Sequence, residues 1–159
     1  IIHCIRFDKS HFGDCEINAE VRKWNPTSWI AGATADWWRK ICSESNLDIK
    51  NNRLESMLYY LIEVARNALE EVGSGEIKVI FEQKKITIVV SDQGHGFENP
   101  NEEIIPGHGL HEVKEYADKF FIETNGRKFT KVKYKQKLAE TSDAEIQQGS
   151  KITFIKNFE

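Results

Sequence analysis

The sequence is poor in cysteine, with three residues, an odd number, and none of them in a Cys-x-x-Cys pair. A disulfide framework needs paired cysteines, so we expect reduced thiols in a cytoplasmic protein. A metal site made from His3, Cys4, His11 and Cys15 matches no compact zinc spacing. A buried cysteine beside an exposed histidine is the more common arrangement, and it is the one we expect here.

The sequence also lacks long apolar runs and an excess of positive charge. No stretch approaches the length of a membrane-spanning helix, and no signal-peptide pattern is visible. The formal net charge is −3, which argues against nucleic acid as a direct partner. The one basic strip alternates along residues 131–137, which is typical of the solvent-facing side of a strand. We therefore expect no membrane and no nucleic acid among the direct partners.

What the sequence does contain is the composition of a folded domain. At 159 residues, with 40% hydrophobic and 30% charged residues, it predicts one domain with a sizeable core. We divide this domain into N-terminal strands and a helix, residues 1–47, and a core, residues 48–159. Trp37 and Trp38 are expected to belong to an aromatic core stripe rather than to an interaction surface.

Hydrophobic periodicity predicts the elements. Strands are expected at 1–7, 15–24, 77–81, 86–90, 120–124, 129–134 and 150–158. Helices are expected from Asn25-Pro26 to 43–46, over 48–72 and over 107–119, with a mobile loop at 92–106 and a polar loop at 138–148. Hairpin connections between consecutive predicted strands outnumber right-handed crossover connections. We therefore predict an α+β two-layer sandwich, with a mixed, mostly antiparallel sheet covered on one face by helices.

Asp92 is the polar residue on which the functional interpretation depends. It ends the β-branched run 86–90 and is followed by Gly94 and Gly96, which allow close approach of the backbone to a ligand. A carboxylate in that position can accept a hydrogen bond from an exocyclic amine. Considered alone, the segment is equally consistent with an ordinary hairpin turn.

Two further segments carry compatible chemistry. The run Gly107-His108-Gly109-Leu110 begins a predicted helix, whose first N–H groups can bind anions. Glu63 and Asn67 are four residues apart and share one face of the 48–72 helix, where they offer oxygen ligands to Mg²⁺ and a base. Each residue alone is most simply a solvated helix residue. Together the three segments indicate a purine nucleoside triphosphate with Mg²⁺, and the 92–106 loop would cover its phosphates.

The common nucleotide motifs are absent: there is no Walker-type Gly-x-x-x-x-Gly-Lys-Ser/Thr, no third glycine after Gly96, and no eukaryotic-type kinase signature. Residues 50–158 instead resemble the GHKL superfamily of ATPases and kinases, which has the Bergerat, or histidine kinase-like, ATP-binding fold. The resemblance rests on four motifs in the family's order. They are an N box at 63–68, the boxes Asp92-x-Gly94-x-Gly96 and Gly107-x-Gly109-Leu110, and a closing Gly-Ser pair at 149–150 before a strand.

The resemblance implies a role for each matching position. Asp92 would bind the adenine amino group, Gly96 would back a bridging water, and Ser150 would supply a hydroxyl that is usually given by Thr. Asn67 would hold Mg²⁺, and Glu63 would be the general base. The backbone N–H groups of the 107–110 run, from Gly107, His108, Gly109 and Leu110, would bind the phosphates.

Glu63 at the first N-box position, together with a short lid, most resembles the anti-sigma factor serine/threonine kinases. That resemblance implies a cytoplasmic signal-transduction kinase that transfers phosphate from ATP to Ser or Thr of an anti-anti-sigma-like partner. It further implies binding to a sigma-like factor and a homodimer. Two alternatives stay open: a histidine-kinase catalytic domain without its dimerisation helices, and a non-catalytic, ATP-gated protein-binding module. A metal cluster of His95, His108 and His111 is less expected than lid or surface positions.

Overall fold

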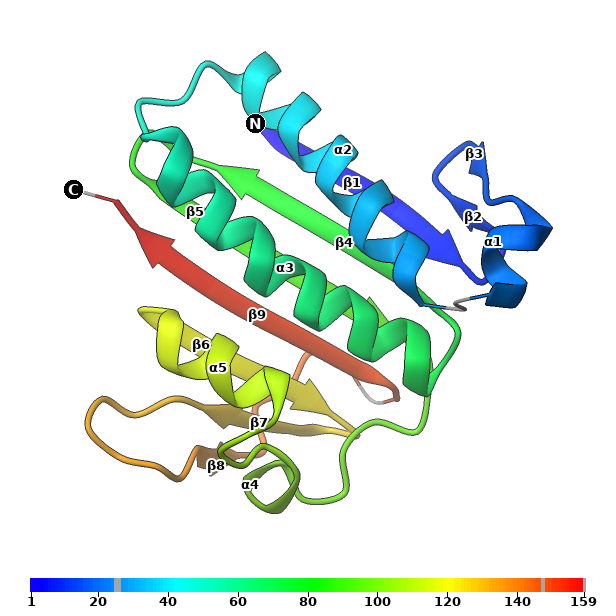
Figure 1. Cartoon of the computed structure of the whole chain (residues 1–159). Helices are drawn as coiled ribbons and strands as arrows, with labels where there is room; N and C mark the ends of the chain where they lie inside the picture. The colour runs from blue at the N-terminus through cyan, green and yellow to red at the C-terminus, as the bar shows by residue number, and fades with distance from the viewer. Residues whose placement is uncertain (25–26, 147, 159) are drawn as a thin grey trace.

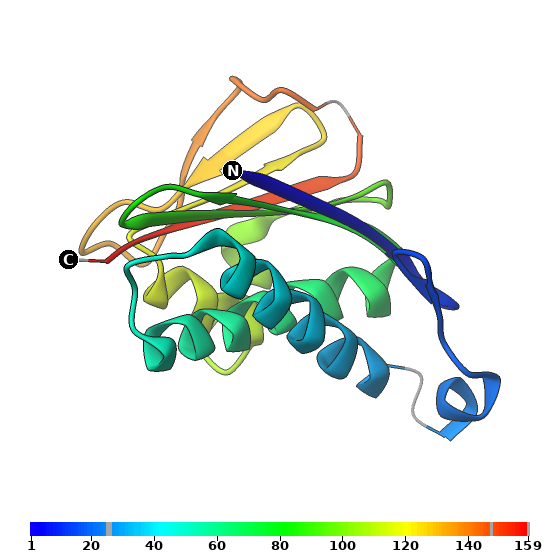
Figure 2. The same ribbon diagram turned by 90° about the horizontal axis from the view of Figure 1, so that it is seen from above.

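The computed structural model describes residues 1–24, 27–146 and 148–158, which form an antiparallel sheet with helices on one face (Figures 1 and 2). The strand order is β3-β2-β1-β4-β5-β9-β6-β7-β8. The strands are β1 (Ile2–Asp8), β2 (His11–Phe12), β3 (Cys15–Glu16), β4 (Ser74–Phe81), β5 (Lys85–Asp92), β6 (Lys119–Thr124), β7 (Arg127–Thr130), β8 (Ala139–Thr141) and β9 (Ser150–Asn157). The helices are α1 (Ala19–Trp24), α2 (Ser28–Ser45), α3 (Asn51–Glu71), α4 (Pro100–Glu103) and α5 (Gly109–Tyr116).

The predicted α+β class and the two layers are confirmed. Figure 2 shows α2, α3 and α5 below the sheet, and none of the helices in the described ranges covers the opposite face. Alternate residues of the central strands point into the interface, so Ile86, Ile88 and Val90 of β5 are at most 2% exposed. The helices cover these residues with their own apolar faces, and burial of both faces stabilises the sandwich.

The long helix α3 forms the centre of the helical layer. Its buried side chains recur at helical spacing: Leu54, Met57, Leu58, Leu61, Val64, Ala65, Ala68 and Leu69. Helix α2 packs beside it through Trp38, which is 1% exposed and whose ring N–H donates to the Leu54 carbonyl across 3.0 Å. The prediction of an aromatic core stripe is thus confirmed for Trp38. Trp37 is only partly buried, against Phe12.

The N-terminal region contains the largest error in the predicted elements. The predicted strand 15–24 is wrong, because only the two-residue β3 forms there and α1 follows it. The side chain of Asn18 accepts the Glu20 N–H at 2.7 Å at the start of this helix, and within the described residues only Cys15 and Glu16 of the segment pair with a strand, β2. The expected buried cysteine is also wrong, since Cys4 and Cys15 are both exposed. Asn25 and Pro26, the predicted start of the first helix, lie outside the described residues.

The sheet also differs from the prediction. Every strand pair of the described residues is antiparallel, so the expectation of a mixed sheet is wrong. The predicted polar loop 138–148 contains β8, which pairs with β7 as an exposed edge strand. Its three residues carry no apolar signal, because neither face of an edge strand must be buried. No helix in the described ranges is both long and apolar enough to span a membrane.

Candidate functional site

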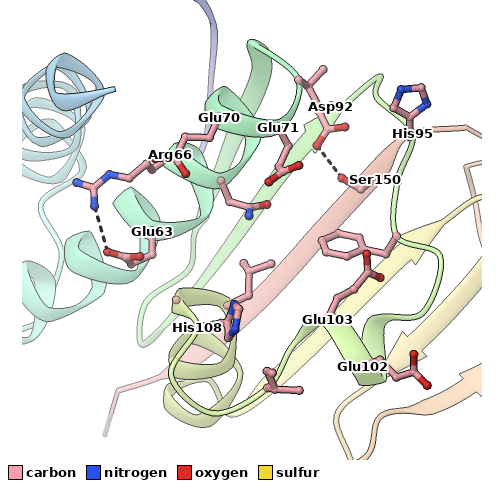
Figure 3. A pocket seen from close by; sticks show the side chains of 17 residues that line it. Glu63, Arg66, Glu70, Glu71, Asp92, His95, Glu102, Glu103, His108 and Ser150 are labelled. Carbon is pink, nitrogen blue, oxygen red and sulfur yellow. Dashed lines mark hydrogen bonds and ion pairs between the residues drawn. The ribbon is translucent and has the colours of Figure 1, made fainter. Parts of the chain in front are cut away.

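A cavity of about 570 Å³ lies between the C-terminal half of α3, the segment after β5, and the start of α5 (Figure 3). Residues from several elements far apart in sequence line it: Glu63, Arg66, Asn67, Glu70, Glu71, Val72, Asp92, His95, Gly96, Phe97, Glu102, Glu103, Ile105, His108, Gly109, Leu110 and Ser150. The three segments that the sequence singled out therefore meet in one cavity.

The sheet register fixes the Asp92 carboxylate in this cavity. Asp92 ends β5 directly opposite Ser150, which begins β9. The Ser150 hydroxyl donates to Asp92 Oδ2 at 2.7 Å, and the Gly94 N–H donates to Oδ1 at 3.0 Å. Each oxygen thus has one internal donor and retains lone pairs for a further donor such as an exocyclic amine.

The loop after Asp92 is held by a residue that the sequence motifs did not identify. The buried Thr124 hydroxyl accepts the Phe97 N–H at 2.8 Å and donates to the Gly149 carbonyl at 3.2 Å. Gly96 has φ +75°, and a Cβ there would overlap the Thr124 oxygen. The Thr124 side chain therefore connects the end of the first glycine box, through Phe97, with Gly149 of the closing Gly-Ser pair. Sequence reasoning treated Thr124 only as the end of a strand.

Glu63 and Asn67 stand one turn apart on α3 and face the start of α5. Oε1 of Glu63 is 3.6 Å from an Arg66 nitrogen, and a Cβ added at Gly109 would overlap Oε2. His108, the N-cap of α5, makes no side-chain capping bond, so the first N–H groups of the helix are not capped by it. The Glu63 carboxylate therefore lies at the end of α5 where backbone N–H groups attract anions.

Negative side chains dominate the lining. Figure 3 shows the carboxylates around the cavity: Glu63, Glu70, Glu71, Asp92, Glu102 and Glu103. Arg66 is the one lysine or arginine among the lining residues. A polyanion would enter this cavity only with a compensating cation, because like charges at such separations repel strongly. Glu63 and Arg66 form an ion pair. The sequence motif assigned a role to Glu63 but none to Arg66.

The segment between the two glycine boxes is short and attached at several points. It contains the single-turn helix α4, which the sequence did not predict. Asn101 exchanges two hydrogen bonds with the Leu138 backbone, at 3.2 and 2.7 Å, and Arg127 donates to the Phe97 and Glu98 carbonyls. Arg127 of β7 and Leu138, the residue before β8, thus hold the segment between the glycine boxes in place, and these nonlocal contacts explain why sequence periodicity missed α4.

Of the ten predicted binding or catalytic residues, eight line the cavity: Glu63, Asn67, Asp92, Gly96, His108, Gly109, Leu110 and Ser150. Gly94 and Gly107 do not line it. Gly94 supplies the N–H to Asp92, and a Cβ at Gly94 would overlap Val72. Gly107 has φ +94° in the turn before α5, which favours glycine.

The histidines do not form a common cluster. His95 and His108 lie at the cavity, whereas His111 lines a different hollow with Glu115. No group of three or more His, Cys, Asp or Glu side chains in the described parts of the chain is arranged to hold a metal. A magnesium ion here would therefore need ligands from the nucleotide as well as from the chain.

The chain matches no protein-family model, and no curated protein has significant sequence similarity to it. The functional interpretation therefore depends on the geometry of this cavity and on the four motifs that line or support it.

Proposed function

We propose that this chain is a Bergerat-type ATP- and Mg²⁺-binding domain that acts as a serine/threonine protein kinase of the anti-sigma factor kind. The observation that supports the proposal most is the convergence of Glu63, Asn67, Asp92 and the start of α5 on one cavity. These residues come from three separate motifs of the sequence, and Ser150 of the fourth motif also lines the cavity. Chance meeting of four such motifs in a single cavity is a weaker explanation than a shared ligand.

The cavity fits the chemistry of Mg·ATP. The Asp92 carboxylate, oriented by Ser150 and Gly94, would accept the adenine amino group. The first N–H groups of α5, at Gly109 and Leu110, would bind phosphate oxygens, and Asn67 would contribute an oxygen ligand to Mg²⁺. Because carboxylates surround the cavity, we expect tight binding only when the divalent cation accompanies the nucleotide.

Glu63 would act on the acceptor. It would take the proton from a Ser or Thr hydroxyl of the partner while that oxygen bonds to the γ-phosphorus and the bond to the departing ADP breaks. The N-terminus of α5 would stabilise the charge on the transferring group. On this proposal the partner is an anti-anti-sigma-like protein. A cytoplasmic location, a sigma-like second partner and a homodimer follow from the same resemblance.

A thermal melt tests the nucleotide part of the proposal. Mg·ATP at a hundredfold excess over its dissociation constant would stabilise the protein by about 2.7 kcal/mol, which raises the melting temperature. ATP with EDTA should give a much smaller shift. No shift with saturating Mg·ATP would contradict the proposal. Incubation with Mg·ATP and a serine-bearing partner then tests the chemistry, since acid-stable phosphate on the partner supports a serine/threonine kinase and acid-labile phosphate supports a histidine kinase.

A non-catalytic, ATP-gated binding module is the second candidate, and one feature favours it. Oε1 of the Glu63 carboxylate is 3.6 Å from Arg66, and Oε2 abuts Gly109, so both oxygens lie close to other parts of the chain. A general base must instead reach the acceptor hydroxyl, at roughly 2.6–3.2 Å. Binding of Mg·ATP without phosphate transfer to any partner would favour this second function.

A further inference from the structure

A second hollow, of about 530 Å³, lies between α5 and the segment that joins β7 to β8. This segment contains the basic strip of residues 131–137, which the sequence predicted to be the solvent-facing side of a strand. Strand β7 ends at Thr130, so that prediction is wrong. The proposed nucleotide site uses none of the residues that line the hollow, which include Pro106, His111, Lys131, Lys133, Tyr134 and Lys135. We refer to it as the basic hollow.

Two lysines fix the shape of the basic segment. Lys131 Nζ donates to the carbonyls of Lys114 and Ala117, each at 2.7 Å, at the C-terminal end of α5. Lys114 is buried and donates in return to the Gln136 carbonyl at 2.9 Å. The segment is thus held against α5 near both of its ends. A surface that is ordered before a partner arrives loses less conformational entropy on binding.

Tyr134 projects from the turn between these two attachments. The Lys135 N–H donates to the Val132 carbonyl at 3.1 Å and closes the turn. Tyr134 has φ +67° and is 93% exposed. A bulky residue seldom adopts this left-handed conformation, and such strain is concentrated at functional sites. The chain therefore holds an aromatic ring in solvent against a backbone preference, and tyrosine is a residue that anchors protein interfaces.

Two other lysines give the hollow its charge. Lys133 and Lys135 are exposed, and neither forms an ion pair with a carboxylate within the described residues. Among the described lining residues Glu115 is the one carboxylate, and it already lies 3.7 Å from Lys114 Nζ and 4.0 Å from His111 Nε2. The hollow therefore presents uncompensated positive charge beside the exposed Tyr134 ring.

The basic hollow adjoins the proposed nucleotide cavity. Ile105 and Leu110 line the cavity, and the residues that follow each of them, Pro106 and His111, line the hollow. The turn before α5 and the first turn of α5 therefore form a wall that the two share. Six carboxylates and one arginine line the cavity on the other side of this wall. A ligand that spans both must place its negative charge over the hollow and an uncharged part at the cavity.

This contrast in charge favours a polypeptide over a nucleic acid as the occupant. A nucleic acid carries negative charge along its whole length, so the carboxylates of the adjoining cavity would repel it. A polypeptide can confine its acidic residues to one short segment. Its apolar side chains would also find Pro106, Val132 and Tyr134 in the hollow.

We propose that the basic hollow and Tyr134 are the docking site for an acidic segment of the phosphate-accepting polypeptide. The docked segment carries aromatic or apolar side chains among its acidic ones, and the Ser or Thr of the same polypeptide reaches the cavity across the wall at Ile105 and Pro106. This inference rests on the proposed kinase function, because that function supplies the acceptor.

The test uses a fluorescein-labelled peptide that has a block of glutamate and tryptophan residues next to a neutral stretch with one serine. A matched peptide has glutamine in place of each glutamate. Binding to the full chain is measured by fluorescence anisotropy without nucleotide. The hollow variant combines Lys133→Glu with Lys135→Glu. The control variant combines Lys50→Glu with Lys84→Glu, which changes the net charge equally at exposed lysines outside the hollow.

We expect the acidic peptide to bind the wild type and the control variant within about twofold of each other, and the hollow variant at least about tenfold more weakly. Tyr134→Ala should weaken binding about fivefold. The glutamine peptide should bind the wild type at least about tenfold more weakly than the acidic one. Equal binding of the two peptides, an equal loss in the hollow and control variants, or no binding to the wild type would overturn the proposal.

Three further measurements distinguish other occupants. The wild type and the hollow variant are tested with a fluorescein-labelled single-stranded oligonucleotide, with vesicles that contain phosphatidylserine, and by sedimentation. Binding of the oligonucleotide or the vesicles that is tighter than binding of the peptide, and is lost in the hollow variant, would overturn the proposal. A wild-type dimer that dissociates in the hollow variant would assign the hollow to a second copy of the chain and overturn it as well.

Failure of this inference can be distinguished from failure of the proposed function. The hollow variant should keep the wild-type shift in melting temperature with Mg·ATP, because its substitutions lie outside the cavity. If the peptide binds as expected and Mg·ATP gives no shift in the wild type, the hollow binds acidic peptides and the kinase function fails. If Mg·ATP stabilises the protein and the acidic peptide shows no preference for the hollow, the docking site fails and the nucleotide site stands.

Discussion

The Ser150 hydroxyl donates a hydrogen bond to Asp92 Oδ2 across 2.7 Å, joining the start of β9 to the end of β5. The two residues are 58 positions apart in the sequence and lie opposite each other in the sheet. The bond orients the Asp92 carboxylate at the proposed adenine position. Lone pairs on its oxygens remain able to accept a further hydrogen bond. The nucleotide proposal can therefore be tested first at this pair.

Replacement Asp92→Asn should reduce the rise in melting temperature with Mg·ATP to about half or less. The amide lacks the negative charge and places an N–H₂ group where an acceptor is needed, so we expect at least about tenfold weaker binding. Asp48→Asn, exposed and outside the cavity, is the matched control and should bind like the wild type. Unchanged nucleotide affinity in Asp92→Asn would refute the site assignment.

Replacement Glu63→Gln should separate binding from chemistry. The amide cannot accept a proton, so the rate of transfer to a serine-bearing partner should fall by about 100-fold or more. The melting-temperature shift with Mg·ATP should remain. Glu70→Gln also changes a cavity carboxylate and should leave the transfer rate within about twofold of the wild type. Full transfer activity in Glu63→Gln would remove this residue from the mechanism.

Replacement Thr124→Val should destabilise the protein. It removes the acceptor of the Phe97 N–H and the donor to Gly149, and we expect a loss of about 2 kcal/mol in the free energy of unfolding, measured by urea denaturation. Thr153→Val is the matched control, because among the described residues the buried Thr153 hydroxyl has no hydrogen-bond partner. That replacement should be neutral or stabilising.

The three thiols should differ in reactivity. Burial, and secondarily the Glu55 carboxylate, raises the pKa of the Cys42 thiol to about 12, so roughly one molecule in ten thousand is thiolate at pH 8. Cys4 and Cys15 are exposed. Intact-mass measurement after brief iodoacetamide treatment should show two adducts on the native protein and three after denaturation. Rapid labelling of native Cys42 would contradict the packing of α2.

Replacement Gly32→Ala should raise the melting temperature by roughly 1–4 °C. Gly32 is within α2, and an added Cβ would meet no atom within 4 Å. Alanine in a helix interior is favoured over glycine by about 0.5–1 kcal/mol. Gly96→Ala is the contrasting variant. It should lower the melting temperature, because the φ of +75° and the nearby Thr124 oxygen both disfavour a side chain.

Most elements could be predicted because their signals are local. The β-branched run ending at Asp92 and the apolar stripe of α3 each identify an element and its buried face without information from elsewhere in the chain. Prediction failed for short segments whose strand and helix conformations differ little in energy. Residues 15–24 alternate like a strand, yet among the described residues only Cys15 and Glu16 of this segment pair with another strand, and α1 follows them. The edge strand β8 has no apolar pattern to find.

The sequence by itself determined the sandwich class, the buried faces of its main elements and the residue types of the candidate site, because periodicity and motif spacing are local properties. Only the tertiary structure decided that Ser150 is hydrogen-bonded to Asp92 and Thr124 to Gly149, and that Glu63 abuts Gly109. Those contacts depend on strand register and on the packing of α3 against α5.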